Sequence, residues 1–320
     1  MRVFTMLVTV VALTACAGAV NPTTPIFSAS RAVPFPMTEK HLYTANRDGT
    51  PGVLLFRQQA NGDVAPSSKI AGSKTTLSDP DSLALDSAGN VYTANDGATE
   101  VAIFAAGKHG NVQPSWTIAG SKTELGPTEG MIVDASDNLY VSDYANNAVR
   151  EFAAGKHGNI APIRSIKGSK TQMATPTGMA VDSHGTLYVA NDHGASVVAF
   201  ASTKKGNVAP SFVISGSNTG LSRPFALTFD SHGRLLVADE GTGLIVFAKG
   251  ATGNATPAAT ITGFGAPTGV VTDAQDHIYV ASFGGAIAMF ASDANGPATP
   301  LRLIQGAKTL LDGTCFLYLR

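Results

Sequence analysis

Short apolar runs separated by turn-forming residues recur along most of this chain. One stretch shows the pattern clearly, with runs at residues 178–182, 187–190, 196–200 and 211–214. The runs are rich in β-branched and aromatic residues, and the Gly, Asn and Asp between them are typical of tight turns. Several runs do not alternate strictly with polar residues, which is typical of a sheet covered on both faces. The pattern predicts units of four short strands.

The four-strand unit repeats at a nearly constant spacing. An aromatic residue marks the third run of each unit, and the steps between copies are 48, 48, 48, 47 and 43 residues: Phe56, Phe104, Phe152, Phe200, Phe247 and Phe290. Self-similarity at a fixed period indicates a repeat architecture, and four-stranded antiparallel units repeated around an axis form a β-propeller. The sequence therefore predicts an all-β, six-bladed β-propeller over residues 39–320. An open solenoid is the competing architecture.

The two ends of the repeat region predict how the ring closes. The first copy starts at Leu42, which corresponds to a second strand, so its first strand is missing. The last copy ends its fourth strand near Ile304, and residues 313–318 then lie where a further first strand belongs. We expect this C-terminal segment to complete the first blade, which leaves no open sheet edge. The segment lacks the Pro-x-Gly start and the closing Asp of the other copies, so its register is left open.

The first 38 residues read as a targeting segment and a linker. Residues 1–15 combine Arg2 with a short apolar run and predict a signal peptide. The sequence Leu-Thr-Ala-Cys that ends at Cys16 resembles a bacterial lipobox, which predicts lipidation of Cys16. The alternative is a plain secretory signal that is cut near Ala15 or Ala17. Residues 16–38 are rich in proline and predict an extended tether. The expected location is therefore extracytoplasmic, as a membrane-anchored lipoprotein of the bacterial cell envelope.

The composition and charge of the chain exclude some classes of binding partner. The formal net charge is −1 and charged residues make up 14% of the chain, so neither nucleic acid nor an anionic membrane surface is an expected partner. The chain contains two cysteines, which excludes a disulfide scaffold. Cys315 is expected to be a buried thiol without a disulfide partner. A monomer that meets the membrane only through its N-terminal lipid is expected.

Residues 176–191 carry a family resemblance. Their sequence, Pro-Thr-Gly-Met-Ala-Val-Asp-Ser-His-Gly-Thr-Leu-Tyr-Val-Ala-Asn, resembles the NHL repeat. The resemblance extends from about residue 40 to the C-terminus and implies a propeller. It implies no single activity, because propellers of this type include protein- and RNA-binding modules, gluconolactonase-like hydrolases and a lyase. A WD-type propeller is a poor match, since the chain has one tryptophan and no Trp-Asp pair.

The resemblance also suggests a candidate metal site. Gluconolactonase-like propellers hold a divalent metal with Glu, Asn and Asp residues near the starts of the first strands. Asp81 and Glu129 occupy such positions on adjacent blades, so they are expected to converge and to be the candidate ligands for Ca²⁺ or another divalent cation. The Asn and the remaining acid of that set are absent here, and no other cofactor is expected. The alternative is that both side chains are solvated acids at the rim of a channel.

Differences between copies give the candidate binding residues. Asn or Asp ends most second strands, and a residue required in nearly every blade is expected to form turns. Function is expected where the copies differ on the face that carries the loops before the first strands and after the second strands. These surface candidates are Asp81, Glu129, Tyr144, His193, Phe225, Glu240 and Phe283. No nucleophile is placed beside a base, so no catalytic residue is predicted.

The function expected from these observations is that of a surface-tethered, non-catalytic binding module. Its partner is expected to be a protein, a peptide or a glycan, bound on the face described above. A metal-dependent hydrolase or lactonase with its site at the mouth of the central channel is the alternative, which leaves enzymatic activity open. A purely structural envelope protein is a third possibility.

Overall fold

The computed structural model describes residues 39–96 and 98–320. The expected signal peptide at residues 1–15, the lipidation residue Cys16 and the tether at residues 16–38 lie outside the described residues and stay predictions. The helices of the described part are two 3₁₀ turns of three residues each, Ser169–Thr171 and Ala307–Thr309. No helix in this part of the chain is long and apolar enough to cross a membrane.

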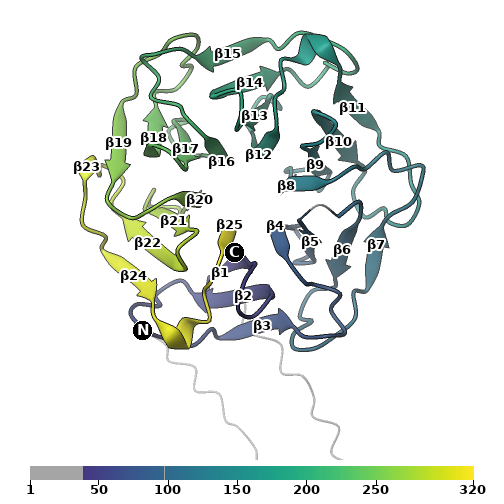
Figure 1. The fold of residues 1–320 in the computed structure, drawn as a ribbon, viewed down its shortest axis with the longest axis vertical. Coiled ribbons are helices and arrows are strands. Elements are labelled where there is room, and N and C mark those ends of the chain that lie inside the picture. Colours follow the sequence, from purple (N-terminus) through teal and green to yellow (C-terminus); the bar gives the residue numbers. More distant parts are fainter. Residues whose placement is uncertain (1–38, 97) are drawn as a thin grey trace, which may run out of the picture. The chain divides into compact units, whose positions relative to one another are not determined.

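Six blades surround a central axis, as Figure 1 shows. Each blade has four antiparallel strands, which are given below in order from the axis outward. Blade 1 contains β25 (Thr314–Leu319), β1 (His41–Asn46), β2 (Gly52–Arg57) and β3 (Ser68–Ala71). Blade 2 contains β4 (Pro80–Leu85), β5 (Val91–Asn95), β6 (Val101–Phe104) and β7 (Trp116–Ile118). Blade 3 contains β8 (Thr128–Val133), β9 (Leu139–Asp143), β10 (Ala148–Phe152) and β11 (Arg164–Lys167).

The remaining three blades follow the same order. Blade 4 contains β12 (Pro176–Val181), β13 (Leu187–Asn191), β14 (Ser196–Phe200) and β15 (Phe212–Ser215). Blade 5 contains β16 (Pro224–Phe229), β17 (Leu235–Asp239), β18 (Gly243–Phe247) and β19 (Ala259–Thr262), and the short β23 (Gly296–Pro297) pairs with β19 in parallel. Blade 6 contains β20 (Pro267–Thr272), β21 (Ile278–Ser282), β22 (Ala286–Phe290) and β24 (Arg302–Gln305). The predicted architecture and blade count are confirmed, and the solenoid is excluded.

The C-terminal strand closes the ring as predicted. β25 pairs antiparallel with β1, with Leu319 opposite Leu42 and Cys315 opposite Ala45, and the register shifts between Thr44 and Ala45. Arg320 stands where the other copies carry their closing Asp. Its guanidinium instead donates to backbone carbonyl oxygens of blade 2, at 2.8 Å and 2.7 Å. Blade 1 therefore gains its inner strand and a contact to the next blade from the same segment.

A second set of contacts links consecutive blades through their Gly-Asn turns. The Asn111 side chain of blade 2 accepts a hydrogen bond from the backbone N–H of Lys74 in blade 1 at 2.7 Å. The same contact recurs around the ring between Asn159 and Lys122, Asn207 and Lys170, and Asn254 and Asn218. Asp63 takes the role of the Asn between blades 6 and 1, where it accepts from the backbone N–H of Lys308 at 2.7 Å. The ring is thus closed at two places.

The repeated aromatic residues form the core between blades. All six third-strand Phe side chains are at most 1% exposed: Phe56, Phe104, Phe152, Phe200, Phe247 and Phe290. Complete burial of one such side chain stabilises the fold by about 1.5–3 kcal/mol. The phenyl groups pack among strands of more than one blade. The repeated Phe residues therefore also hold neighbouring blades together.

The polar residues that end the second strands fix the loops on one face. The Asn95 side chain at the end of β5 accepts hydrogen bonds from the backbone N–H groups of Ser78 and Asp79, just before β4, at 3.0 Å and 3.2 Å. Asp239 does the same for Ser222 and Arg223 ahead of β16. The expected turn-forming role of this series is confirmed. We call the face with these loops the ligand face, and the face with the turns between first and second strands the opposite face.

Candidate functional site

The inner strands begin around the axis on the ligand face and form the channel mouth. We define the mouth by the second residue of each inner strand: Asp81, Glu129, Thr177, Phe225, Thr268 and Cys315. The two threonines show what this position needs, because each hydroxyl donates to a carbonyl oxygen of the next inner strand. Thr177 donates to Pro224 at 3.1 Å and Thr268 donates to Thr314 at 2.5 Å. An ionised carboxylate cannot make this contact, so the two acids stand out.

Asp81 is the acid with the least satisfied surroundings. It is 2% exposed, and neither of its oxygens accepts a hydrogen bond from the described residues. The Arg47 guanidinium forms an ion pair with it, with Nη1 3.7 Å from Oδ2. A buried charge without hydrogen bonds is energetically costly. Burial accordingly raises the pKa of Asp81, and the Cys315 thiol and the Arg47 charge only partly offset this.

Asp81 and Glu129 converge, as their positions on adjacent blades suggested. One carboxylate oxygen from each of Asp81, Asp96 and Glu129 lies within 4.8 Å of the other two. Burial, followed by the neighbouring Asp81 carboxyl, raises the pKa of Glu129 to about 9. Glu129 therefore holds a proton at neutral pH, because two carboxylates this close do not both ionise readily. The structure shows the convergence, while binding of a metal by these residues stays a prediction.

Arg47 completes the group, and the sequence did not single it out. Its Nε lies 2.7 Å from Oδ1 of Asp79, and its Nη2 lies 2.7 Å from Oδ2 of Asp96. Arg47 follows the Asn that ends β1, at the position where Asp96 follows the Asn that ends β5. Other blades carry an acidic residue at this position, and the basic residue in blade 1 is the sequence signal that could have identified Arg47. Asp96 directly follows Asn95, one of the repeated turn-forming residues, and nothing in the repeat distinguishes it.

Cys315 places a thiol in the same ring. It is 1% exposed and forms no disulfide, so the expectation of a buried free thiol is confirmed. Burial, together with the neighbouring Asp81 carboxylate, raises the pKa of the Cys315 thiol well above its ordinary value. Since the thiolate is the reactive form, this cysteine is unsuited to act as a nucleophile.

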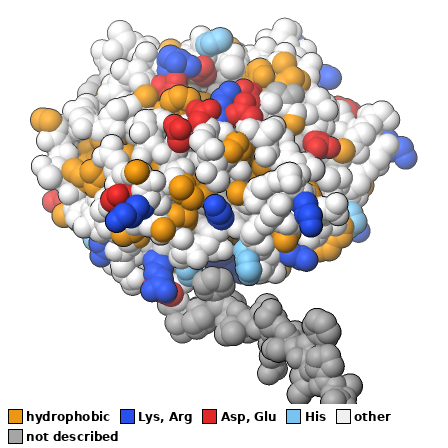
Figure 2. All heavy atoms as spheres, turned by 60° about the horizontal axis from the view of Figure 1, so that its bottom comes forward, with side chains coloured by type: hydrophobic (Ala, Val, Ile, Leu, Met, Phe, Trp, Pro, Cys, Tyr) orange, Lys and Arg blue, Asp and Glu red, His pale blue; other side chains and the backbone are white. Residues whose placement is uncertain are grey.

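A second charged group lies on the ligand face across blades 4 and 5. The Arg223 guanidinium contacts Asp192 at 2.9 Å and Glu240 at 2.7 Å. His193 lies beside Asp192 at 3.7 Å, but its side chain is 72% exposed. Figure 2 shows acidic side chains concentrated around basic ones in the upper part of the view, with more scattered charges elsewhere on the visible surface. The mouth and this second group together make the ligand face rich in paired charges.

The remaining predicted residues differ in their exposure. Tyr144 is half-buried near the mouth acids, and burial followed by the charges of Asp96 and Glu129 raises its pKa. Phe283 is 44% exposed. The expectation of a surface position is wrong for Asp81, which is 2% exposed, and for Phe225, which is 7% exposed and packs on Phe316 with ring centroids 5.3 Å apart. Phe316 belongs to the closing strand, whose register the sequence left open.

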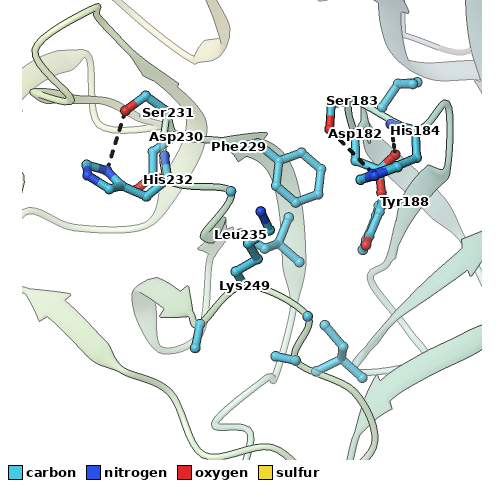
Figure 3. Close-up of a pocket in the computed structure, with 16 residues that line it drawn as sticks. Asp182, Ser183, His184, Tyr188, Phe229, Asp230, Ser231, His232, Leu235 and Lys249 are labelled. Carbon is cyan, nitrogen blue, oxygen red and sulfur yellow. Dashed lines mark hydrogen bonds between the residues drawn. The ribbon is translucent and has the colours of Figure 1, made fainter.

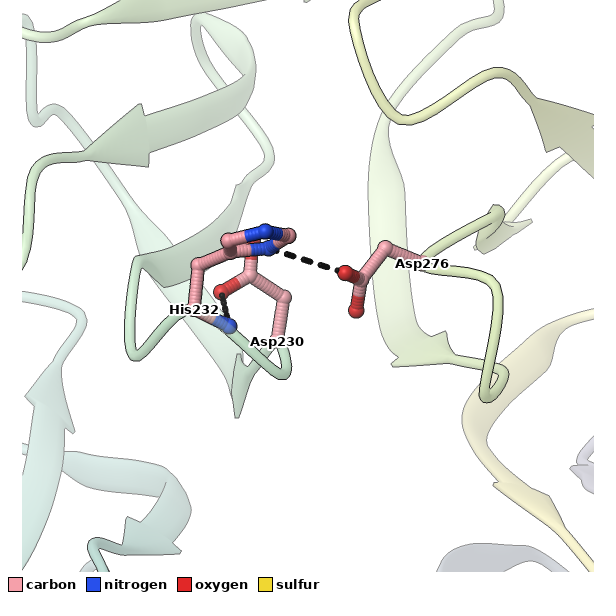
Figure 4. A group of neighbouring side chains, drawn as sticks. All are labelled: Asp230, His232 and Asp276. Carbon is pink, nitrogen blue, oxygen red and sulfur yellow. Dashed lines mark hydrogen bonds and ion pairs between the residues drawn. The ribbon is translucent and has the colours of Figure 1, made fainter.

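The mouth acids fit a divalent cation better than the other acid-containing group does. Asp230, His232 and Asp276 lie together in turns of the opposite face (Figure 4), and one possible ligand atom from each lies within 4.8 Å of the other two. There, every carboxylate oxygen already accepts hydrogen bonds, from Ser231, His232 or Arg234. At the mouth, Asp81 has free acceptors and Asp96 and Glu129 supply further oxygens, which are the ligands hard cations prefer.

The fold and the site together define a closed six-bladed β-propeller with an acidic channel mouth. No family model matches the chain, and no curated protein sequence matches it. Solved structures match over most of its length. A protein of unknown function from Bacteroides caccae superimposes with a TM-score of 0.63 at 11% identity, covering 88% of this chain and 98% of that chain.

Two further structures show the same likeness. A chain from a nidogen/laminin complex superimposes with a TM-score of 0.63 at 14% identity, covering 88% of this chain and 98% of that chain. A streptogramin B lyase superimposes with a TM-score of 0.50 at 11% identity, covering 84% of this chain and 75% of that chain. At these identities the likeness shows the fold alone. The resemblance to the NHL family stays a prediction.

Proposed function

We propose that this NHL-like propeller is a non-catalytic binding module that recognises a cationic group at its channel mouth. The observation that carries the proposal is the Asp81 carboxylate, which is buried and accepts no hydrogen bond from a backbone N–H or a cationic side chain. A positively charged ligand atom supplies the contact that this carboxylate lacks. The absence of any nucleophile beside a base among the predicted site residues supports binding over catalysis.

The charge at the mouth narrows the partner to a protein or peptide with a lysine or arginine side chain. Arg47 contacts Asp79 and Asp96 at 2.7 Å but stays 3.7 Å from Asp81. Three carboxylates therefore face one guanidinium even while Glu129 keeps its proton. Excess negative charge favours a cationic partner and speeds its association. A neutral glycan gains nothing from this charge.

A charged peptide probe tests the proposal. Fluorescein-labelled tetralysine is titrated at low salt and followed by fluorescence anisotropy. Asp81→Asn keeps the size of the side chain and removes its charge, and we expect it to weaken binding about tenfold, since close charge pairs contribute on the order of 1–2 kcal/mol. Glu100→Gln removes one exposed charge from the same face and should leave binding nearly unchanged. Equal weakening in both variants would show a diffuse charge effect and would contradict a site at the mouth.

The location of the module is also part of the proposal. The lipobox-like sequence ending at Cys16 and the proline-rich residues 16–38 support an anchored lipoprotein of the bacterial cell envelope. A binding module held at a membrane surface gains effective concentration for partners in the same compartment.

A metal-dependent hydrolase or lactonase is the second candidate, and the three converging oxygens of Asp81, Asp96 and Glu129 favour it. A divalent ion held there would polarise a carbonyl group of a substrate. Thermal unfolding with and without Ca²⁺ or Zn²⁺ separates the two candidates. The ion is added at about 1 mM, a concentration that also fills weak sites. A rise in Tm that Asp81→Asn and Glu129→Gln each abolish supports the metal site. The absence of any rise excludes it and leaves the binding module.

A further inference from the structure

A cavity of about 360 Å³ opens on the opposite face between blades 4 and 5. Figure 3 shows its two walls, the Ser183–His184 turn of blade 4 and the Ser231–His232 turn of blade 5, with Phe229 and Lys249 between them. The volume lies within the range of small-molecule and side-chain pockets. It is separate from the mouth, because these turns connect first and second strands on the other side of the propeller.

Arginines of the chain itself reach across three of the other grooves between blades. In the groove between blades 3 and 4, Arg164 donates from Nε to the Lys204 carbonyl at 2.7 Å and from Nη2 to the Ala201 carbonyl at 3.1 Å. Between blades 6 and 1, Arg302 donates to the Gln58 carbonyl at 3.1 Å. In each case, a guanidinium reaches the turn that follows the third strand of the next blade. Between blades 5 and 6, Arg234 makes the same kind of contact with the Ser292 carbonyl at 3.1 Å.

The groove between blades 4 and 5 lacks this arginine, as do the grooves after blades 1 and 2, where Ser68 and Trp116 hold the position of Arg164. Phe212 occupies the position of Arg164, and Ala199 occupies the position of Glu151, the ion-pair partner of Arg164 at 3.3 Å. Two smaller or apolar side chains therefore stand where a guanidinium and a carboxylate fill the neighbouring groove. Phe212 packs edge-on against Tyr188, which lines the cavity, with ring centroids 5.4 Å apart.

The groups that bind the guanidinium elsewhere are retained in the cavity. The repeat step of 47 residues places Ala248 and Ala251 in the positions of Ala201 and Lys204, and both alanines line the cavity. Their backbone carbonyls correspond to the two acceptors of Arg164. The carboxylate of Asp182 also lines the cavity, which supplies a negative charge in place of Glu151.

Aromatic rings form the inner side of the cavity. Tyr188 meets Phe229 edge-on, with centroids 4.9 Å apart and an interplanar angle of 78°. A guanidinium binds well against such rings through cation–π contact. Lys249 adds a positive charge at the cavity, but Arg164 binds in a hollow that Lys204 and Lys205 also line. A nearby lysine is therefore compatible with a bound guanidinium in this fold.

We propose that the cavity between blades 4 and 5 binds the guanidinium group of an arginine side chain of a partner polypeptide. The incoming group takes the place that Arg164 and Arg302 take in their own grooves. It donates to the carbonyls of Ala248 and Ala251 and packs on Phe229. This site is independent of the mouth and gives the propeller a second contact with a basic partner.

The test uses N-acetyl-arginine amide as the probe and N-acetyl-citrulline amide as its neutral, nearly isosteric control. Backbone amide chemical shifts of the ¹⁵N-labelled propeller are followed by NMR during titration. We expect saturable shifts at residues 248–251 with the arginine probe, and at least about tenfold weaker binding of the citrulline probe, because charge-assisted hydrogen bonds are lost. Shifts located elsewhere, or equal binding of both probes, would overturn the proposal even without any variant.

A blocking variant gives the second test. Phe212→Arg supplies a guanidinium from the chain itself and is expected to weaken probe binding about tenfold or more, since it mimics the filled grooves. Ser68→Arg adds the same charge at the equivalent outer-strand position of blade 1 and should have no effect. Asp81→Asn should also leave probe binding at residues 248–251 unchanged, which separates this site from the mouth. Unchanged binding in a folded Phe212→Arg protein would refute the assignment.

Discussion

The Asp63 carboxylate accepts a hydrogen bond from the backbone N–H of Lys308 at 2.7 Å, across 245 residues of sequence. Asp63 is the acidic counterpart of the Asn side chains that link the other blades, and it joins blade 6 to blade 1. Asp63→Ala is expected to lower the free energy of unfolding by about 0.5–1 kcal/mol, because the exposed backbone N–H of Lys308 loses its hydrogen-bond acceptor. Urea denaturation followed by fluorescence measures the change.

Asp63→Asn provides the matched control for this prediction. It keeps the side-chain oxygen that accepts from Lys308 and should therefore retain nearly all of the parent stability. A loss as large as that of Asp63→Ala would show that the charge, and not the hydrogen bond, is what stabilises the closure.

Removal of the closing strand is expected to be far more damaging. Deleting residues 313–320 takes away β25 and leaves β1 as an unpaired edge beside the channel. We expect a loss on the order of 5 kcal/mol or more, since a whole buried strand is removed. Differential scanning calorimetry tests this, with Arg320→Ala as the graded control. That variant loses only the side-chain contacts to Asp86 and Ser87 and should cost about 1–2 kcal/mol.

The pKa of Glu129 predicts a pH dependence of stability. Its value of about 9 in the folded protein lies above the ordinary value of 4.5, so the folded state binds the proton more tightly than the unfolded state does. The stabilisation from this proton is complete below the ordinary pKa and is lost progressively as the pH rises through about 9. Glu129→Gln should remove this dependence and make the protein more stable than the parent at pH 8, because the amide stays neutral without binding a proton.

Urea denaturation at several pH values checks this expectation. The pH values run from about 5 to about 9, which covers most of the range between the ordinary and the raised pKa of Glu129. Glu100→Gln serves as the control, because Glu100 is exposed and should not alter the slope. A parent protein whose stability is flat across this range would contradict the buried, protonated state of Glu129.

Lipidation at Cys16 predicts membrane association. Cys16→Ser should release the protein into the soluble extracytoplasmic fraction, because the acylated cysteine is the expected membrane anchor. Cell fractionation followed by immunoblotting measures the distribution. Membrane association that persists in this variant would favour a different anchor.

The fold was predictable because the repeat supplies independent markers in every blade. The third-strand Phe residues and the turns recur at one period, and they set blade count and strand order together. The register of β25 was not predictable, since the segment lacks the markers and its pairing contains a shift between Thr44 and Ala45. The misplacement of Phe225 follows directly, because its packing partner Phe316 lies on that strand.

Only part of the channel-mouth site was predictable from the sequence, because the repeat pattern covers the strands and not the loops. Asp81 and Glu129 could be found because they interrupt the repeat at a position whose direction the strand fixes. Arg47 and Asp79 lie in loops, where neither periodicity nor spacing specifies which side chains meet. Asp96 was hidden by repetition, although its contact with Arg47 at 2.7 Å is specific to one pair of blades.

The pairing of His41 with Arg320 sets the orientation of any attached molecule. The two residues exchange backbone hydrogen bonds where β1 begins and β25 ends, on the side away from the mouth. The described chain therefore enters the propeller next to His41 on the face opposite the mouth. A molecule that reaches the mouth approaches from the end of the propeller away from this entry point.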